Sequence, residues 1–261
     1  MSLLATQDLT IRFGGHVAVD AVTCSFEPGT LTAIVGPNGA GKTTYFNLIS
    51  GQLKASAGRV SLNGRDLSGL SASQRTRAGL GRAFQLTNLF PRLSVLENVR
   101  LAVQASREGS HRRGLNLLSI WSDHEALTAR AREILEQVAL LPKQDELVSA
   151  LPHGDQRKLE VALLMALEPQ VFMFDEPTAG MNAAEAPVIL DLIRRLKADK
   201  RKTILLVEHK MDVVRELADR IIVLHNGALV ADGKPAEVIA LPVVQEAYLG
   251  ASSPSAEGAH P

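Results

Sequence analysis

The chain is poor in cysteine, in net charge and in long apolar runs. Cys24 is the only cysteine, which excludes an intramolecular disulfide and a cysteine-based zinc site and fits a reducing compartment. Lysine and arginine number 28, as do aspartate and glutamate. This zero net charge argues against a dedicated nucleic-acid-binding protein but leaves room for a local basic patch. No apolar run reaches membrane-spanning length and the N-terminus lacks a signal pattern, so we expect a cytoplasmic protein, alone or bound to another component.

The sequence predicts one large α/β domain with an insertion. Its 261 residues are 46% hydrophobic and 21% charged, enough for a sizeable core with a smaller subdomain. Strand and helix patterns alternate in residues 1–91 and 167–250, which we predict to form the core, whereas about 92–166 reads as an inserted helical subdomain. The small, polar tail at 251–261 is expected to be disordered.

A glycine-rich segment with the spacing G-x-x-x-x-G-K-[ST] is the strongest signal. Its residues are Gly36, Pro37, Asn38, Gly39, Ala40, Gly41, Lys42, Thr43 and Thr44. Glycines let successive backbone N–H groups point at phosphate oxygens, Lys42 reaches the β- and γ-phosphates, and the Thr43 hydroxyl can bind Mg²⁺. An apolar strand at 31–35 precedes the segment and a helix over 45–49 follows. This context favours a phosphate-binding loop over a glycine-rich turn without a ligand.

Two further strand ends carry polar side chains. The apolar run 171–174 ends in Asp175 and Glu176. Asp175 can hold Mg²⁺ through water, and Glu176 can orient or deprotonate an attacking water. The strand predicted at 203–207 is followed closely by His209, which can donate a hydrogen bond to a γ-phosphate oxygen. For Asp175 and Glu176, the alternative is a solvated turn, which the presence of the phosphate-binding loop in the same chain disfavours. For His209, the alternative is a structural or solvated histidine.

The N-terminal segment predicts a β-hairpin ahead of the loop strand. Residues 3–12 and 17–26 alternate apolar and polar positions around Gly14 and Gly15. Phe13, near the turn, is a candidate platform for a purine ring, because an aromatic face stacks on a base at little entropic cost. A phenylalanine on a strand is more often part of the core.

Helix signals dominate the middle of the chain. The segments 71–74 and 94–97 have capping-box spacing, so we expect a short helix that stops by Gly79 and a second helix over 95–106. Residues 107–120 mix Gly, Arg, Ser and His and are interpreted as an insertion or helical excursion.

Helical periodicity returns at 124–141. Ile134, Leu135 and Val138 fall on one face, and Pro142 is expected to end this helix.

The segment 151–160, Leu-Pro-His-Gly-Asp-Gln-Arg-Lys-Leu-Glu, indicates a family. Together with the phosphate-binding loop, Gln85, Asp175-Glu176 and His209 in this order, it resembles the signature motif of ATP-binding-cassette (ABC) ATPases. The resemblance covers nearly the whole chain. It implies a P-loop NTPase core, with a mostly parallel sheet and an antiparallel β subdomain, into which the helical subdomain is inserted.

Three features resemble one branch of this family. They are the signature ending Gly-Asp-Gln-Arg-Lys-Leu-Glu, the run Thr-Ala-Gly-Met-Asn at 178–182 and the helical excursion after residue 105. They are similar to the ATP-binding subunits of bacterial importers for branched-chain amino acids and related amides such as urea.

The resemblance implies ATP and Mg²⁺ as cofactors and gives the matching residues their roles. The nucleotide-binding residues it implies are Phe13 on the adenine, Gly36 to Thr44 as the Walker A loop, and His153, Gly154 and Asp155 in the signature. The catalytic residues it implies are Lys42, Gln85, Glu176 and His209. The metal ligands it implies are Thr43, Gln85 and Asp175. Ala179–Asn182 match the loop that contacts the opposite subunit.

Family members work as dimers, which implies a second ATPase subunit, identical or different. Two ATP molecules are sandwiched, each between the Walker A loop of one subunit and the signature of the other. Pro152 departs from this pattern, because the signature usually has a serine whose hydroxyl bonds the γ-phosphate. We expect Gly154 and His153 to complete the anion site with weaker ATP-driven closure.

The function implied is ATP hydrolysis that energises a membrane importer from the inner face of the cell membrane. The implied partners are transmembrane permease subunits and a periplasmic substrate-binding protein, with no nucleic acid. The Gln85 loop is expected to contact the permease through Leu86, Leu89 and Phe90, although packing in the core explains these apolar residues equally well. The alternatives are a soluble ABC ATPase acting on nucleic acid or the ribosome, a regulatory subunit with little turnover, and an exporter ATPase for lipids.

Overall fold

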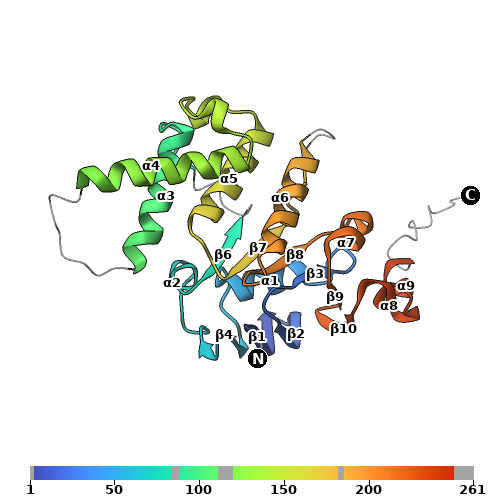
Figure 1. The fold of residues 1–261 in the computed structure, drawn as a ribbon. Helices are drawn as coiled ribbons and strands as arrows, with labels where there is room; N and C mark the ends of the chain where they lie inside the picture. The colour runs from blue at the N-terminus through green and yellow to red at the C-terminus, as the bar shows by residue number, and fades with distance from the viewer. Residues whose placement is uncertain (1–2, 84–88, 111–119, 182–184, 250–261) are drawn as a thin grey trace, which may run out of the picture. The chain divides into compact units, whose positions relative to one another are not determined.

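The computed structural model describes residues 3–83, 89–110, 120–181 and 185–249 (Figure 1). The chain divides into two compact units, one formed by Met1–Gly69 with Leu206–Pro261 and the other by Leu70–Leu205. Helices combine with a mixed sheet and an antiparallel sheet, so the predicted α/β class is confirmed. The predicted limits of the helical subdomain, about 92–166, stay a prediction.

An antiparallel sheet opens the first unit. Its strands, in spatial order, are β2 (His16–Phe26), β1 (Leu4–Phe13), β4 (Ala57–Leu62) and β5 (Arg65–Asp66). β1 and β2 pair from Leu4 opposite Phe26 to Phe13 opposite His16, which confirms the predicted hairpin. The register shifts around Asp8, whose φ angle is 46°, so the hairpin contains a bulge there.

Strand β3 (Leu31–Val35), which leads into the glycine-rich loop, lies in a second sheet. It pairs in parallel with β9 (Arg220–His225), and β10 (Ala228–Gly233) pairs antiparallel with β9. All five residues of β3 are buried, as expected for a strand that is covered on both faces. The described helices of this unit are α1 (Lys42–Ser50), α7 (Met211–Leu217), α8 (Pro235–Ile239) and α9 (Pro242–Leu249).

The second sheet has six strands in the order β10-β9-β3-β8-β7-β6. β8 (Thr203–Val207) crosses the boundary between the units, whereas β7 (Val171–Asp175) and β6 (Leu80–Ala83) belong to the second unit. β6 and β7 pair in parallel, with Arg82 opposite Met173. Every residue of β8 is buried, which explains why this stretch of the sequence is apolar without alternation.

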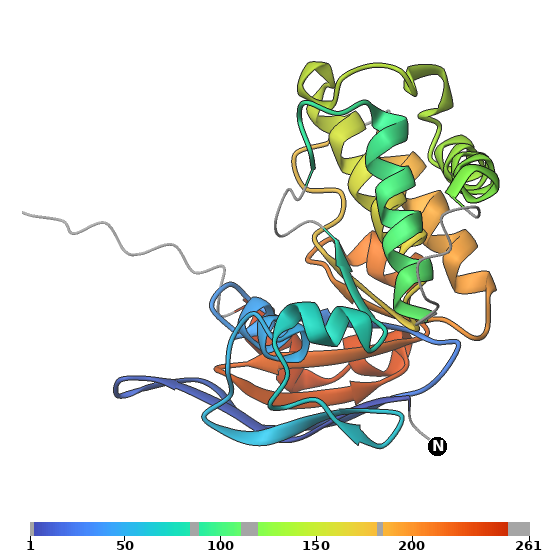
Figure 2. The same ribbon diagram turned by 90° about the vertical axis from the view of Figure 1, so that its left-hand side faces the viewer.

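Helices make up most of the second unit. They are α2 (Ala72–Arg77), α3 (Val95–Ser110), α4 (Ile120–Gln137), α5 (His153–Ala166) and α6 (Ala186–Ala198), with short 3-10 helices η1 (Leu141–Lys143) and η2 (Val148–Ala150). α3 and α5 lie side by side, and α4 packs against both (Figure 2).

Both predicted capping boxes are present. The Ser71 hydroxyl accepts the Gln74 backbone N–H, and the Gln74 side chain accepts the Ser71 backbone N–H. Ser94 and Glu97 exchange the equivalent bonds at 2.9 and 3.1 Å. These reciprocal bonds satisfy backbone donors that a helix start leaves without partners, so both helices begin where the sequence predicts.

Two predicted helix ends are wrong. α3 continues to Ser110 rather than ending at residue 106; the rest of the predicted insertion, 111–119, lies outside the described residues. α4 ends at Gln137, before Leu141, and Pro142 lies in η1. The reason is local: Ala139 has a φ angle of 56°, and the Leu140 N–H donates to the Leu135 carbonyl at 2.8 Å. This left-handed C-terminal motif usually contains glycine, which the sequence lacks here.

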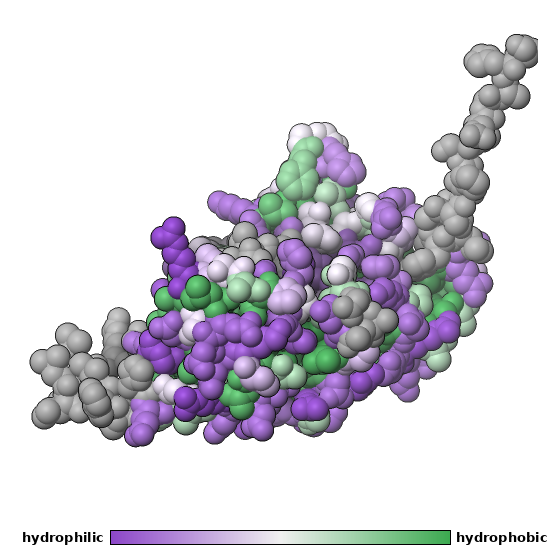
Figure 3. Space-filling view, turned by 90° about the horizontal axis from the view of Figure 1, so that it is seen from above, coloured by the Kyte–Doolittle hydropathy of each residue, from purple (hydrophilic) through white to green (hydrophobic). Residues whose placement is uncertain are grey.

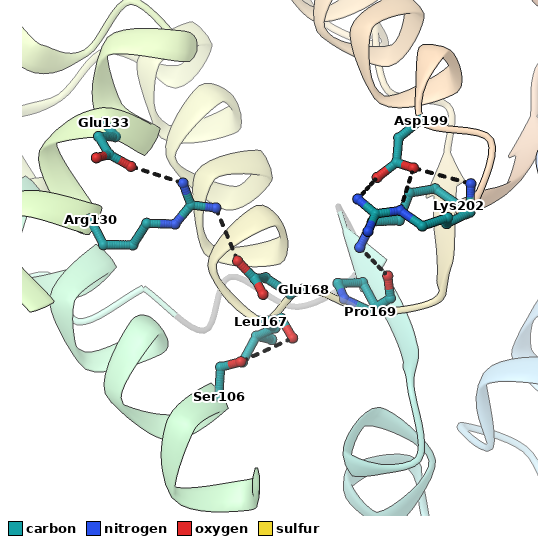
Figure 4. Close-up of polar contacts among 9 residues, drawn as sticks. Ser106, Arg130, Glu133, Leu167, Glu168, Pro169, Asp199 and Lys202 are labelled. Atoms are coloured by element: carbon teal, nitrogen blue, oxygen red, sulfur yellow. Dashed lines mark hydrogen bonds and ion pairs between the residues drawn. The ribbon is translucent and has the colours of Figure 1, made fainter.

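Side chains from α3, from α4 and from the residues before β8 contact the segment 167–169, which follows α5 (Figure 4). Ser106 of α3 donates to the Leu167 carbonyl at 3.4 Å, and Arg130 of α4 pairs with Glu168 at 3.0 Å. Lys202, just before β8, donates to the Pro169 carbonyl at 3.2 Å. Arg130 is partly exposed, so its ion pair contributes little; we interpret the contacts as fixing position rather than supplying most of the stability.

Within the described ranges, no helix combines the length and apolar character needed to cross a membrane. Polar residues predominate on the face in Figure 3, with hydrophobic residues in separate groups.

Candidate functional site

The glycine-rich loop between β3 and α1 has a backbone that only glycine fits at two positions. Gly36 has a φ angle of 148°, and a Cβ atom there would lie 2.1 Å from the Leu224 carbonyl oxygen. Gly41 has a φ angle of 93°, and its Cβ would lie 2.5 Å from the Ala18 carbonyl oxygen. Both conformations are unfavourable for other residues, so the loop shape depends on the two glycines that the motif requires.

Lys42 lies folded over this loop. Its ammonium group donates to the carbonyl oxygens of Gly36 and Pro37 at 2.7 and 2.8 Å. α1 starts at Lys42, and the loop residues Asn38 and Gly39 are exposed to solvent. A positive helix end, a lysine ammonium and an exposed loop backbone together form an environment that attracts an anion.

Phe13, at the end of β1, is not a core residue. Its side chain is 51% exposed, so the alternative role in packing does not apply. An exposed ring is available to stack on a base, although adenine stacking itself stays a prediction.

His209 follows β8 in the first unit and has a side chain that is 54% exposed. The preceding residue, Glu208, is 1% exposed and lies against it, with 3.4 Å between Glu208 Oε1 and His209 Nδ1. Glu208 was not among the functional residues predicted from the sequence. A carboxylate directly after the apolar run 204–207 was the available signal.

Asp175 is the last residue of β7 in the second unit, and Glu176 follows it directly. Asp175 Oδ2 accepts a hydrogen bond from the Arg82 guanidinium of β6 at 2.8 Å, and the two side chains are only 8% and 12% exposed. Burial lowers the pKa of Arg82, and the facing Asp175 carboxylate offsets part of that effect. The sequence analysis also missed Arg82, although an arginine within a buried strand was visible.

Glu176 departs from ordinary strand geometry. Its φ angle is 47°, a left-handed conformation that is uncommon for a residue other than glycine. Such backbone strain gathers at functional sites, where surrounding structure maintains it. The conformation therefore fits the catalytic role that the sequence predicts for Glu176.

The predicted signature segment forms the start of α5. Pro152 is the N-cap residue, with no side-chain cap hydrogen bond. His153 is exposed, whereas Gly154 and Asp155 are buried. The exposed start of the helix, rather than the Asp155 side chain, is thus the part that a ligand can reach.

Asp155 is held by two lysines. Lys143 of η1 donates to Oδ2 at 2.6 Å and Lys158 donates to Oδ1 at 2.8 Å. Burial raises the pKa of Asp155, but the hydrogen bonds and charges of the two lysines outweigh burial and lower it overall. The carboxylate is therefore ionised and ties η1 to the beginning of α5.

Gly154 allows a close approach by Glu185, the N-cap of α6. A Cβ atom at Gly154 would lie 2.1 Å from Glu185 Oε1. Any larger residue at position 154 would displace the carboxylate. This packing gives the signature glycine a structural reason in addition to its predicted role in nucleotide binding.

Two predicted functional positions lie outside the described residues. They are Gln85 and Asn182. Leu86 of the predicted permease contacts also lies outside, whereas Leu89 and Phe90 are described.

The donor types of Thr43 and Asp175 fit Mg²⁺. Both supply oxygen atoms, which Mg²⁺ prefers, and Thr43 is exposed. In the described part of the chain no three His, Cys, Asp or Glu residues gather as a metal-binding group. Mg²⁺ commonly binds through one or two protein ligands together with substrate phosphates and water, so these residues fit an ion that arrives with a nucleotide.

An apolar cavity of about 380 Å³ lies within the second unit. α3 and α5 line it together with Leu89, Phe90 and the end of β6; Arg82 and Glu160 are its charged members. Burial raises the pKa of Glu160, and Arg157, which pairs with it at 3.1 Å, opposes this shift. Phe90 is 55% exposed.

Comparison with known proteins decides the family. The ABC transporter profile matches residues 19–179. The chain belongs to the ABC transporter family. The high-affinity branched-chain amino acid transport ATP-binding protein LivG of Salmonella typhimurium is 39% identical over 250 residues, which cover 95% of this chain and 98% of LivG. BraF of Pseudomonas aeruginosa, named for the same transport, is 36% identical over 250 residues, with the same coverage.

Solved structures agree. The ADP conformation of MJ1267, an ATP-binding cassette of an ABC transporter, matches with a TM-score of 0.79 and 30% identity, covering 96% of this chain and 99% of that chain. The predicted P-loop NTPase fold is therefore confirmed. As an ABC ATPase, the chain binds ATP and couples its hydrolysis to transport by membrane permease partners.

Proposed function

We propose that this ABC ATPase energises an importer of branched-chain amino acids or related amides. The observation that carries the proposal is the 39% identity to LivG, which extends over 98% of that protein. A similarity of this extent includes the segments that distinguish the branch, rather than the phosphate-binding loop alone.

The chemistry proposed is in-line attack of water on the γ-phosphorus of ATP. Lys42 and the loop backbone stabilise the charge on the transferred phosphoryl group, Glu176 orients the water and accepts its proton, and His209 donates to a γ-phosphate oxygen. Thr43 and Asp175 would hold Mg²⁺, which would supply positive charge to offset that of the phosphates. The ammonium of Lys42, now on the Gly36 and Pro37 carbonyls, turns to the phosphates as they arrive.

The active form proposed is a dimer with another ATPase subunit, identical or different. The start of α5, with Gly154 buried beside an exposed His153, completes the nucleotide site of the partner. A two-fold pair supplies each site with one loop and one signature. ATP binding closes the pair and hydrolysis opens it.

The cavity between α3 and α5 is the proposed contact for the permease subunits. It is mostly apolar, and Phe90 at its edge is half exposed. Arg82 lines the cavity and also forms an ion pair with Asp175. It therefore connects the proposed permease contact with a predicted metal ligand. The assembly would lie at the inner face of the membrane, with a periplasmic substrate-binding protein on the other side.

Uptake of labelled leucine by cells that lack the gene tests the proposal. The parent chain should restore uptake, whereas Glu176→Gln should not. Ala102→Arg, which fills the cavity, should abolish uptake and co-purification of permease subunits while ATP binding persists. Ala126→Arg, on the exposed face of α4, is the matched control. A parent chain that restores transport of another class of compound, and not of leucine, contradicts the proposed substrate.

A further inference from the structure

Glu208 is a carboxylate buried from solvent at the start of the turn after β8. It directly follows β8, whose five residues are all buried, and is itself only 1% exposed. Glutamate is almost never fully buried unless it is paired, because removal from water disfavours the charge. Within the described ranges, its Oε2 atom has no hydrogen-bond partner. A buried polar atom of this kind is rare and often marks a functional position.

The other carboxylate oxygen collects contacts from the next two residues. Oε1 accepts the backbone N–H of His209 at 2.9 Å and of Lys210 at 3.1 Å. It also lies 3.4 Å from His209 Nδ1. Lys210 is the N-cap of α7 and makes no side-chain cap hydrogen bond. A single oxygen of Glu208 therefore holds the turn between β8 and α7.

The His209 side chain extends from this turn. The imidazole is about half exposed, so packing constrains it only in part and the backbone beneath it matters more. Its Nδ1 atom lies 3.4 Å from the carboxylate oxygen Oε1, so Nε2 is the ring nitrogen that does not face Glu208. The two nitrogens of histidine are distinct, and a carboxylate at one of them fixes which nitrogen serves the other partner.

We propose that Glu208 is a positioning residue for His209. Its carboxylate fixes the backbone and the ring so that Nε2 meets the γ-phosphate of bound ATP. The inference rests on the proposed function, in which His209 donates to that phosphate. Glu208 does not touch the nucleotide; it acts through the histidine, and its effect on the rate disappears when the imidazole is absent.

Two variants of similar length separate this role from a structural one. Glu208→Gln keeps an oxygen that can accept both backbone N–H groups, whereas Glu208→Met keeps the length and has no such acceptor. Methionine removes the cost of burying a charge, so the melting temperature should stay within about 3 °C of the parent. The rate should nevertheless fall about tenfold, because small misplacements of a catalytic group are costly.

The measurement is steady-state ATP hydrolysis by the parent, both Glu208 variants, His209→Ala and the Glu208→Met/His209→Ala double variant. We expect Glu208→Met to lower kcat about tenfold with KM for ATP within about twofold, and Glu208→Gln to retain most of the rate. The double variant should be as slow as His209→Ala alone. A Glu208→Met variant as fast as the parent, or a double variant in which the two defects multiply, overturns the inference.

A spectroscopic readout keeps this outcome separate from failure of the proposed function. The His209 ring signals in a ¹H–¹⁵N spectrum, assigned by their loss in His209→Ala, should move in Glu208→Met and change less in Glu208→Gln. A parent that hydrolyses no ATP contradicts the proposed function. Ring signals that are unchanged in Glu208→Met contradict the positioning role, whatever the parent's activity.

Discussion

Asp155 shows how a residue in a predicted nucleotide-binding motif can also hold the fold. Lys143 and Lys158 contact its two carboxylate oxygens, and the side chain is 11% exposed. Together the lysines outweigh burial and lower its pKa from the ordinary value. The two ion pairs therefore stabilise the folded state fully at pH values above the pKa of Asp155 in the unfolded state, about 4. This stabilisation is lost as the pH falls through the lower pKa of Asp155 in the folded state.

Asp155→Asn should destabilise the protein by about 2 kcal/mol at pH 7, since hydrogen bonds to charged groups contribute on that order. The difference in the free energy of unfolding between Asp155→Asn and the parent should shrink below pH 4. Denaturant unfolding at several pH values measures it, with Asp145→Asn, at an exposed position, as the control. A difference between Asp155→Asn and the parent that is constant from pH 7 to pH 3 would count against the two ion pairs.

Pro152→Ser tests the effect of the altered signature. Serine at an N-cap position accepts a backbone N–H of the first turn, and its hydroxyl would add a donor to the proposed anion site. We expect faster ATP hydrolysis and stronger ATP-dependent dimerisation, measured by phosphate release and gel filtration. Pro152→Ala removes the proline ring without adding a hydroxyl and is the control. If Pro152→Ser changes neither the rate nor the dimerisation, the expectation that Pro152 weakens ATP-driven closure of the dimer is wrong.

Functional residues could be predicted from the sequence where they belong to a motif with a fixed spacing. The loop from Gly36 to Thr44 could be predicted because its geometry is local and its glycines are required by the backbone. Arg82 and Glu208 could not, because each acts on a neighbour that only folding reveals. Arg82 reaches across from β6 to Asp175, and Glu208 turns back onto its own chain.

Elements were predictable where their signals are local. Both capping boxes lie within four residues of sequence, and both helices begin as predicted. The end of α4 was missed because Ala139 adopts a left-handed conformation without the usual glycine, and the sequence offered only Pro142 as a stop.

Ala139→Gly should therefore stabilise the protein by about 1 kcal/mol, since an alanine pays for its left-handed conformation and glycine does not. The reference is Ala129→Gly, on the exposed face within α4, which should destabilise by a similar amount. Thermal or denaturant unfolding measures both. The interpretation of this helix end fails if the two substitutions have the same sign.

At the scale of the whole molecule, the class of fold was predictable because motifs in a fixed order resemble one family. The predicted domain limits stay a prediction, because limits of this kind depend on contacts between distant segments. The chain divides at Gly69 and Leu205, positions with no distinctive composition. The proposed dimer is likewise a property of two chains, because the nucleotide-binding role proposed for the signature segment at the start of α5 requires the phosphate-binding loop of a second subunit.

The most direct test of the central claim is Mg²⁺-dependent ATP hydrolysis by the purified parent beside Glu176→Gln, with gel filtration of both in ATP. Glu133→Gln, on the exposed face of α4, is the control. The account predicts turnover in the parent and the control, and loss of turnover in Glu176→Gln together with an ATP-bound dimer that persists. A Glu176→Gln variant that hydrolyses ATP at the parent's rate would contradict it.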